Sequence, residues 1–436
     1  MVKEKPHLNL VIIGHIDQGK STMMGALLIQ TGAVTEREAR ELEKIAKEFD
    51  RDSWSAAYVF DKLKEERQRG ITIDLAFRKF DTNSKTFTVI DAPGHQDFVK
   101  NMITGASQAD AAVLVISGKK GEMEVGIAAN GQTREHAYLA QTLGVKQLVV
   151  AVNKMDIWEY KKERYDEVVV ASSALLKQIG FNVKKIHFVP VSGLKSENLA
   201  EKCDKISWYD GPTLLEALDE FTLPEKPTGK PLRIPIQDAY KIKGTGVVPV
   251  GRVETGVLKK GDRIIIQPGG FTGEIRSMEM HHEEINQAEP GDNIGMSIRG
   301  LTIEQVSRGD CLGHPATPPT VINTKGSWTG QVIVIWHPTA LAQGYTPVVH
   351  AHTTQVASKF VELIKKLDQK TGAVIEDNPK FIKKNEVAIV KLQPIRKICL
   401  EKYEDIPEMG RFAVRDMGRT VAVGIVKDID IGVQDT

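Results

Sequence analysis

The sequence predicts an α/β domain followed by all-β domains in one multi-domain chain. Residues 1 to about 225 alternate apolar, strand-like runs with helix-like segments, which is typical of a sheet flanked by helices. A proline-rich stretch at 223–231 follows, and beyond it the pattern changes to short strands separated by glycine turns, which indicates small barrels. At 436 residues the chain has room for two to four domains. We therefore expect domains at 1–225, 226–320 and 321–436.

The first region contains five apolar runs that predict strands: Leu8–Ile13, Phe87–Ile90, Ala111–Ile116, Gln147–Val152 and His187–Val191. In an α/β sheet the loops that bind ligands lie at the carboxyl ends of such strands. The segment Thr35–Arg69 is charged and favours helix, with Leu42, Ile45 and Phe49 at helical spacing. We expect an inserted helical hairpin there, with these three side chains in the core.

The remaining residues predict two separate β units. The first has short runs at Leu232–Ile236, Gly246–Val253, Arg263–Gln267, Gly273–Met278 and Asn293–Ile298. The second begins at about Asn323 and has runs at Gln331–Trp336, Val348–Thr353, Val387–Leu392 and Thr420–Ile425. Aromatic residues in these units are more often core or interface than platforms for RNA bases, and we expect this of Tyr345, Phe360 and Phe412.

A glycine-rich loop directly follows the first apolar run. It comprises Gly14, His15, Ile16, Asp17, Gln18, Gly19, Lys20, Ser21 and Thr22. The backbone N–H groups of such a loop bind phosphate oxygens, Lys20 adds a cation for the terminal phosphates, and Ser21 offers a hydroxyl ligand to Mg²⁺. A plain strand–turn–helix junction is the alternative. The buried run before the loop and the helix-compatible residues 23–30 after it favour a nucleoside triphosphate site.

Two later segments indicate that the base is guanine. Asn153, Lys154 and Asp156 follow the fourth apolar run. The Asp156 carboxylate can accept N–H bonds from ring N1 and exocyclic N2 of guanine, whereas adenine has no donor at the ring position. Asn153 would tie this loop to the phosphate loop, and the Lys154 stem would cover one face of the base. An ordinary helix N-cap by Asp156 is the alternative. The pocket would be completed by backbone N–H groups of Ser192, Gly193 and Leu194.

The residues between these segments predict hydrolysis and a switch. Asp91 would hold Mg²⁺ through water, and the Gly94 N–H would reach the γ-phosphate. His95, next to this glycine, is predicted to orient the attacking water as the catalytic residue. Thr72 is predicted to coordinate Mg²⁺ only in the triphosphate state, so that hydrolysis would release its segment. A surface histidine and an ordinary threonine are the alternatives.

In this order and spacing the segments resemble the translational GTPases. Residues 14–22, 64–73, 91–106 and 131–136 are similar to the elongation factor 1-alpha family of archaea and eukaryotes, and the likeness continues at 246–256 and 411–416. It implies a P-loop GTPase domain followed by two β-barrel domains. It also implies delivery of aminoacyl-tRNA to the ribosomal A site, with hydrolysis of GTP to GDP and phosphate on codon recognition.

The chain departs from this family at two positions. Gln18 stands where histidine is common and Gln96 where arginine is usual. Because position 18 contributes backbone to the phosphate loop, we expect its side chain to matter little. Gln96 lies beside the predicted catalytic histidine and could alter the surface that faces the ribosome.

The resemblance implies aminoacyl-tRNA, the ribosome and a guanine-nucleotide exchange factor as partners, and leaves release and rescue factors open. We expect a cytoplasmic monomer without a membrane partner, because no signal-like start and no run of eighteen apolar residues is present. The net charge of +1 says nothing about nucleic acid, so any RNA contact must come from local patches.

Residues 359–402 are one such patch, with eleven Lys/Arg against six Asp/Glu, and a solvated barrel face is the alternative. Arg411 and Arg415 are weak candidates for a contact with RNA or with another domain. The three cysteines lie far apart and form no metal-binding pattern, which suits a reducing compartment.

Other members of the superfamily share the GTPase domain and are alternatives to this interpretation. The initiation-factor gamma subunit usually has a zinc knuckle, yet no cysteine precedes Cys203. Release or rescue GTPases and the selenocysteine-specific factor are expected to carry terminal extensions. The GTPase subunit of sulfate adenylyltransferase and a purely regulatory GTP-binding module would use the same first domain without binding tRNA.

Overall fold

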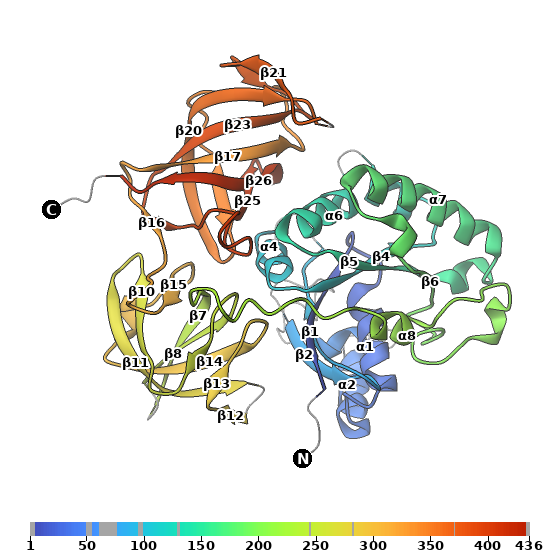
Figure 1. The fold of residues 1–436 in the computed structure, drawn as a ribbon. Coiled ribbons are helices and arrows are strands. Elements are labelled where there is room, and N and C mark those ends of the chain that lie inside the picture. Colours follow the sequence, from blue (N-terminus) through green and yellow to red (C-terminus); the bar gives the residue numbers. More distant parts are fainter. Residues whose placement is uncertain are drawn as a thin grey trace. The chain divides into compact units, whose positions relative to one another are not determined.

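The computed structural model describes residues 5–48, 55–60, 76–94, 99–128, 131–243, 246–280, 283–369 and 371–432. The chain divides into two compact units, Met1–Pro224 and Glu225–Thr436, each with its own internal packing (Figure 1). The division of the second unit at 320/321 stays a prediction, as does the exact boundary at 225/226. No helix in the described part of the chain is long and apolar enough to cross a membrane.

The first unit is built around a mixed sheet in the order β2-β3-β1-β4-β5-β6. Five of its strands are parallel: β1 (His7–Ile13), β3 (Thr86–Asp91), β4 (Ala111–Ser117), β5 (Gln147–Asn153) and β6 (Phe188–Pro190). They coincide with the five predicted runs, which are therefore confirmed. An edge strand that was not predicted, β2 (Ala76–Asp81), pairs antiparallel with β3.

Helices cover both faces of this sheet (Figure 1), which explains why Leu8 to Ile13 of β1 are at most 1% exposed. On one face lie α4 (Val99–Ser107), α6 (Gln132–Leu143) and α7 (Lys162–Ile179); on the other lie α1 (Lys20–Gln30), α2 (Glu36–Glu48) and α8 (Leu214–Asp219). A short helix, α5 (Glu122–Ile127), follows β4. Short 3₁₀ turns occupy Ala57–Val59, Met155–Trp158, Val183–Lys185 and Asp204–Ile206.

The predicted helical hairpin is seen in part. Its first arm is α2, where Leu42 is buried and Ile45 packs against the core, as expected from their spacing. Phe49 and residues 61–69 lie outside the described residues. Among the described residues after α2 is the 3₁₀ turn Ala57–Val59, whose three side chains are all buried.

The second unit contains two closed β-barrels. In the first, the order is β10-β15-β7-β8-β14-β11, and a further β10–β11 pairing closes the ring of six strands. These strands are β7 (Ile234–Ile242), β8 (Gly246–Arg252), β10 (Arg263–Gln267), β11 (Phe271–Met280), β14 (Asn293–Arg299) and β15 (Cys311–Gly313). Smaller additions are β9 (Leu258–Lys259), β12 (Glu283–Ile285), β13 (Gln287–Ala288) and the 3₁₀ turn Ile303–Gln305. The five predicted runs all fall within or overlap these strands.

The second barrel has the order β19-β25-β26-β17-β23-β20, closed by a β19–β20 pairing. Its strands are β17 (Ser327–Val334), β19 (Val348–Ala351), β20 (Thr354–Leu367), β23 (Val387–Pro394), β25 (Arg411–Asp416) and β26 (Arg419–Asp430). Short strands add to it: β16 (Val321–Ile322), β18 (Leu341–Ala342), β21 (Val374–Asp377), β22 (Phe381–Ile382) and β24 (Ile398–Cys399). The predicted runs overlap β17, β19, β23 and β26, whereas β20 and β25 were not predicted.

The polar and aromatic residues singled out in this barrel have internal roles. Phe360 and Phe412 are fully buried, so the expectation of core positions is confirmed for these two residues. Tyr345 is half-buried, and its hydroxyl donates a hydrogen bond to Asp416 Oδ2 at 2.8 Å. Arg415 is buried and donates to Thr420 Oγ1 and Gly418 O.

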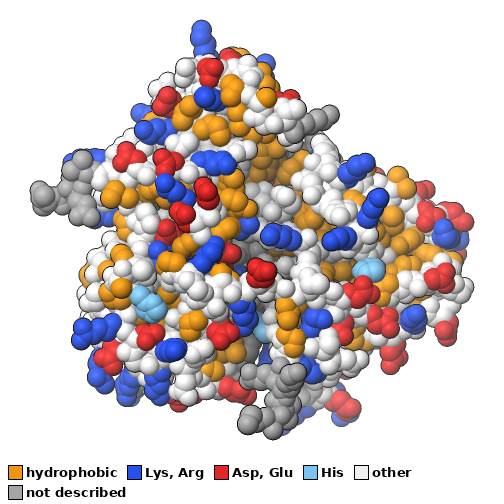
Figure 2. Space-filling model, in the orientation of Figure 1, with side chains coloured by type: hydrophobic (Ala, Val, Ile, Leu, Met, Phe, Trp, Pro, Cys, Tyr) orange, Lys and Arg blue, Asp and Glu red, His pale blue; other side chains and the backbone are white. Residues whose placement is uncertain are grey.

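On the face seen in Figure 2, side chains of both charge signs are interspersed, in keeping with the net charge of +1.

Candidate nucleotide-binding site

The phosphate loop joins β1 to α1, and its backbone needs glycine at both ends. Gly14 has φ +147°, and a Cβ there would lie 2.5 Å from Val115 O. Gly19 is left-handed at φ +81°, and its Cβ would lie 2.6 Å from Asn153 Nδ2. The first turn of α1 carries no acidic side chain, so its N–H groups and the helix dipole present a positive end. This geometry suits an anion such as a phosphate.

Lys20 places a buried cation in the same loop. Its Nζ donates to His15 O at 3.0 Å, and a Cβ on Gly94 would lie only 2.3 Å from that nitrogen. Burial lowers the pKa of Lys20, and the charges of Asp91 and Asp17 oppose the shift. Because an ammonium in a poorly solvated site is costly, a bound phosphate oxygen would stabilise it.

The predicted Mg²⁺ ligands from the loop and from β3 meet. Ser21 Oγ donates to Asp91 Oδ2 at 2.6 Å, and the Asp91 carboxylate is fully buried at the end of its strand. A hydroxyl and a carboxylate are the hard oxygen ligands that Mg²⁺ prefers, and the ion takes its other ligands from water and phosphate. In the described ranges, no three His, Cys, Asp or Glu residues form a metal-binding group. Thr72 and His95 lie outside the described residues.

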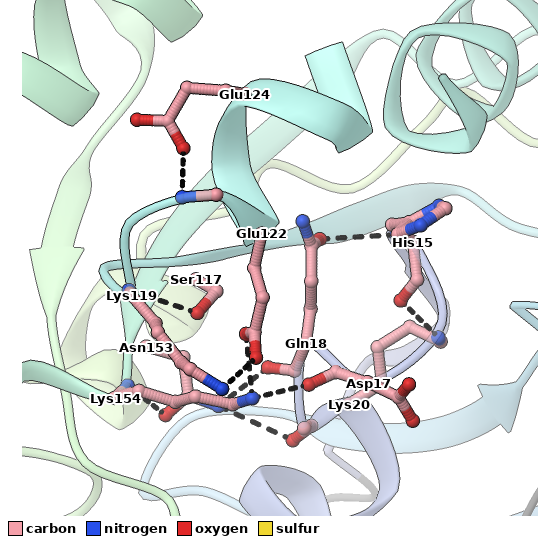
Figure 3. A network of polar contacts seen from close by, with 12 residues as sticks. His15, Asp17, Gln18, Lys20, Ser117, Lys119, Glu122, Glu124, Asn153 and Lys154 are labelled. Carbon is pink, nitrogen blue, oxygen red and sulfur yellow. Dashed lines mark hydrogen bonds and ion pairs between the residues drawn. The ribbon is translucent and has the colours of Figure 1, made fainter. Parts of the chain in front are cut away.

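Asn153 joins three loops with one buried amide. Its Nδ2 donates to Gln18 O of the phosphate loop at 2.9 Å. Its Oδ1 accepts from the backbone N–H groups of Lys154, at 2.8 Å, and of Gly193, at 2.9 Å. The predicted tie between the base loop and the phosphate loop, from Asn153 to Gln18, is thus present in the structure (Figure 3). Gly193 adds the third segment.

The base-recognition residues lie beside this junction. Asp156 Oδ1 accepts from Ser192 Oγ at 2.6 Å, and within the described residues its Oδ2 has no hydrogen-bond partner. The alternative role of Asp156 as a helix N-cap is wrong, because the N-cap position of the 3₁₀ turn Met155–Trp158 is Lys154 and that of α7 is Lys161. Leu194, 53% exposed, offers an apolar side chain next to Ser192.

Sequence reasoning missed a set of residues on α6 that contact the phosphate loop from behind. Thr133 Oγ1 donates to Gln18 Oε1 at 3.4 Å, and Gln18 Oε1 also accepts from the His15 N–H at 3.1 Å. His136 Nδ1 accepts from the Gly14 N–H at 3.4 Å, and Gln132 Oε1 from the Ile16 N–H at 3.5 Å.

These contacts correct one expectation. The Gln18 side chain was expected to matter little, but it is fully buried and braces the loop (Figure 3). The available signal was the segment 131–136, which carried the family likeness without a role for any of its side chains.

Comparison with known proteins covers nearly the whole chain. Residues 5–224 match the family model described as the elongation factor Tu GTP binding domain. Residues 246–313 match elongation factor Tu domain 2, and residues 327–427 match the GTP-eEF1A C-terminal domain-like family.

Among relatives, elongation factor 1-alpha of Saccharolobus solfataricus is 55% identical over 430 residues, which cover 98% of each chain. That of Hyperthermus butylicus is 54% identical over 432 residues, again covering 98% of each chain. The solved structure of the S. cerevisiae Ski7 GTPase-like domain bound to GTP shares the fold, with a TM-score of 0.81 at 19% identity over 97% of each chain.

Proposed function

This chain belongs to the elongation factor 1-alpha family, and from that premise we propose that it delivers aminoacyl-tRNA to the ribosomal A site. It is a translational GTPase that binds GTP and GDP through its first unit, where residues 5–224 match the GTP-binding domain of elongation factor Tu. Hydrolysis of GTP to GDP and phosphate on codon recognition would then release the factor from the ribosome.

The junction at Asn153 is the observation that carries the nucleotide part of the proposal. One buried amide fixes the phosphate loop, the base loop and the segment at Gly193 relative to one another. A site formed by these three segments would accommodate a molecule with phosphates at one end and a base at the other. The free Asp156 oxygen next to Ser192 favours guanine, because guanine has two N–H donors at adjacent positions on that edge.

The residues would divide the work as follows. The phosphate-loop amides and Lys20 bind the phosphates, and Ser21, Thr72 and Asp91 hold a magnesium ion, which when bound neutralises charge that develops on the phosphates. His95 is the proposed catalytic residue and orients water for attack. We expect His95→Ala to leave GTP affinity within about threefold and to remove most ribosome-stimulated hydrolysis. Unchanged single-turnover rates on ribosomes would show that His95 has another role.

The two barrels are the proposed partners of the first unit in binding tRNA. We propose domains at 1–225, 226–320 and 321–436, which together would hold the acceptor arm of an aminoacyl-tRNA. The ribosome and a guanine-nucleotide exchange factor are the further partners that the family implies, and release and rescue factors stay open as additional ones. The factor would act as a monomer in the cytoplasm.

Nucleotide-dependent retention of charged tRNA tests this function. The purified chain is incubated with aminoacyl-tRNA and either GTP, a non-hydrolysable GTP analogue or GDP, and the retained tRNA is measured by filter binding. We expect retention with GTP and the analogue and little with GDP. Uncharged tRNA is the control for general RNA binding. Equal retention with GDP, or of uncharged tRNA, would contradict the proposal and favour one of the GTPases that do not carry tRNA.

A further inference from the structure

Glu122, the first residue of α5, uses both carboxylate oxygens to bind two lysines. Oε2 lies 2.7 Å from Lys154 Nζ, and Oε1 lies 3.0 Å from Lys119 Nζ. The Glu122 and Lys154 side chains are only 23% and 24% exposed. This pair is therefore shielded from water more than an ordinary surface ion pair, and a charge-assisted hydrogen bond in such a place contributes more than an exposed one.

Lys154 uses the same ammonium group to reach the phosphate loop. Its Nζ donates to Asp17 O at 2.5 Å, in addition to its bond with Glu122. Figure 3 shows the Glu122 side chain pointing down from α5 toward the Lys154 nitrogen, beside the Asp17 carbonyl. One ammonium thus links the loop after β4, the loop after β5 and the phosphate loop.

Glu122 itself is held firmly. The helix start is fixed by the Gly121 N–H, which donates to Glu124 Oε2 at 2.7 Å. Arg164 of α7, whose side chain is 4% exposed, donates to Glu124 at 3.2 Å and to Gly118 O at 2.6 Å. Burial works to raise the pKa of Glu122, but hydrogen bonds from Lys154, Ser117 and Lys119 outweigh it and lower the pKa. The carboxylate is therefore charged at neutral pH.

We propose that Glu122 is a positioning residue of the nucleotide site, which holds the Lys154 ammonium against Asp17 O and so keeps the lysine stem over the guanine base. This inference rests on the proposed nucleotide site. Fixing a lysine side chain costs rotamer freedom. Because Glu122 already fixes Lys154, this entropy is not lost again when a nucleotide binds. The nucleotide therefore binds to an ordered base loop and dissociates slowly.

The substitution Glu122→Gln tests the proposal. It keeps the size of the side chain and can still accept a hydrogen bond, but it removes the charge. We expect GDP and GTP to dissociate roughly three- to tenfold faster, since a charged bond is replaced by a neutral one. Dissociation of a fluorescent GDP or GTP analogue from the purified full chain is followed by stopped flow.

Glu124→Gln is the matched control. Glu124 lies two residues further along α5, and its charge pairs with the buried Arg164 of α7 rather than with a nucleotide loop. A glutamine in its place can still accept the Gly121 N–H bond, so the start of α5 and the position of Glu122 are kept. Thermal unfolding of both variants without nucleotide measures their effects on stability. We expect Glu124→Gln to change dissociation less than twofold even where it lowers stability more than Glu122→Gln.

A double-mutant cycle with Lys154→Met separates positioning from a general structural effect. If Glu122 acts through Lys154, then Glu122→Gln has no further effect on dissociation in the Lys154→Met background. Equal acceleration in both backgrounds, or equal acceleration by Glu122→Gln and Glu124→Gln, would overturn the inference while leaving the nucleotide site intact. A wild-type chain that fails to bind the fluorescent nucleotide would instead refute the proposed function.

Discussion

Asn153→Ala is the sharpest test of the nucleotide site, because one side chain connects three segments through three hydrogen bonds of 2.9 Å or shorter and a weaker fourth to Gly19 O at 3.5 Å. The substitution removes the donor to Gln18 O and leaves the N–H groups of Lys154 and Gly193 without their acceptor. Asn153 is 2% exposed, so water cannot easily replace these partners.

The magnitude follows from these contacts. Each buried hydrogen bond contributes a net ~1 kcal/mol, so the three together contribute about 3 kcal/mol. Part of this loss appears as lower stability of the empty chain. The rest appears on nucleotide binding, because the phosphate loop and base loop must then be ordered together. If about 2 kcal/mol falls on binding, the affinity for GDP drops by roughly 30-fold.

The assay is equilibrium titration with a fluorescent GDP analogue, together with urea unfolding of the nucleotide-free chain. Asn198→Ala is the control: Asn198 is also buried in the first unit, but it makes a single side-chain bond, to Pro190 O at 2.9 Å. It should cost stability with little change in affinity. If Asn153→Ala and Asn198→Ala weaken GDP binding equally, or neither does by more than about threefold, the junction does not organise the site.

Three further outcomes follow from the structure. Gln18→Leu removes the acceptor for the His15 N–H and should weaken GDP binding by about tenfold, whereas Gln18→His, the residue common in the family, should weaken it less. If GDP titration curves of the two variants and the wild type are equal, the Gln18 side chain does not support the phosphate loop. Glu401→Ala removes the carboxylate whose Oε1 lies 2.6 Å from Nε of Arg233, a side chain that is only 5% exposed. This should lower the free energy of urea unfolding by about 3–5 kcal/mol, and a loss below about 1 kcal/mol would show that the ion pair is not critical. Burial lowers the pKa of His352 to about 4 from 6.5, so between pH 6.5 and 4 the unfolded chain binds a proton that the folded chain excludes. The free energy of unfolding should therefore decrease by up to ~3 kcal/mol as the pH is lowered through this window. If the free energy of unfolding depends on pH in the same way in His352→Gln, this histidine is not the cause.

The parts of the fold that could be predicted are those whose pattern is local and regular. The parallel strands of the first unit are buried on both faces, and their apolar runs stand out from the charged helices around them. The long strand β20 could not be found in this way. Register shifts at Phe360/Glu362 and at Leu363/Lys365 interrupt its alternation. The buried residues Val356 and Phe360 are in phase with a period of two, but the buried Leu363 comes three residues after Phe360 and is out of phase.

The residues of the nucleotide site likewise divide into those that a local sequence pattern predicts and those that it does not. The phosphate loop, Asn153, Asp156 and Asp91 belong to short motifs at strand ends, and the structure brings them together as the α/β class requires. Gln18 and Thr133 meet although they are 115 residues apart, and nothing in either local sequence specifies the contact. Such a contact depends on how α6 packs behind the loop. Only a model of the packed helices can predict it.

These long-range contacts share a target, which is the backbone of the phosphate loop. Thr133 acts on it through the Gln18 side chain, Asn153 bonds Gln18 O, and Lys154 bonds Asp17 O. Residues of the chain itself therefore brace the loop, so that less of the energy of nucleotide binding is spent on ordering it. Lys20 lies within this loop, and burial lowers its pKa although the charges of Asp91 and Asp17 oppose the shift. A bound phosphate would add negative charge beside this buried ammonium, so the braced backbone and the buried cation both favour an anion.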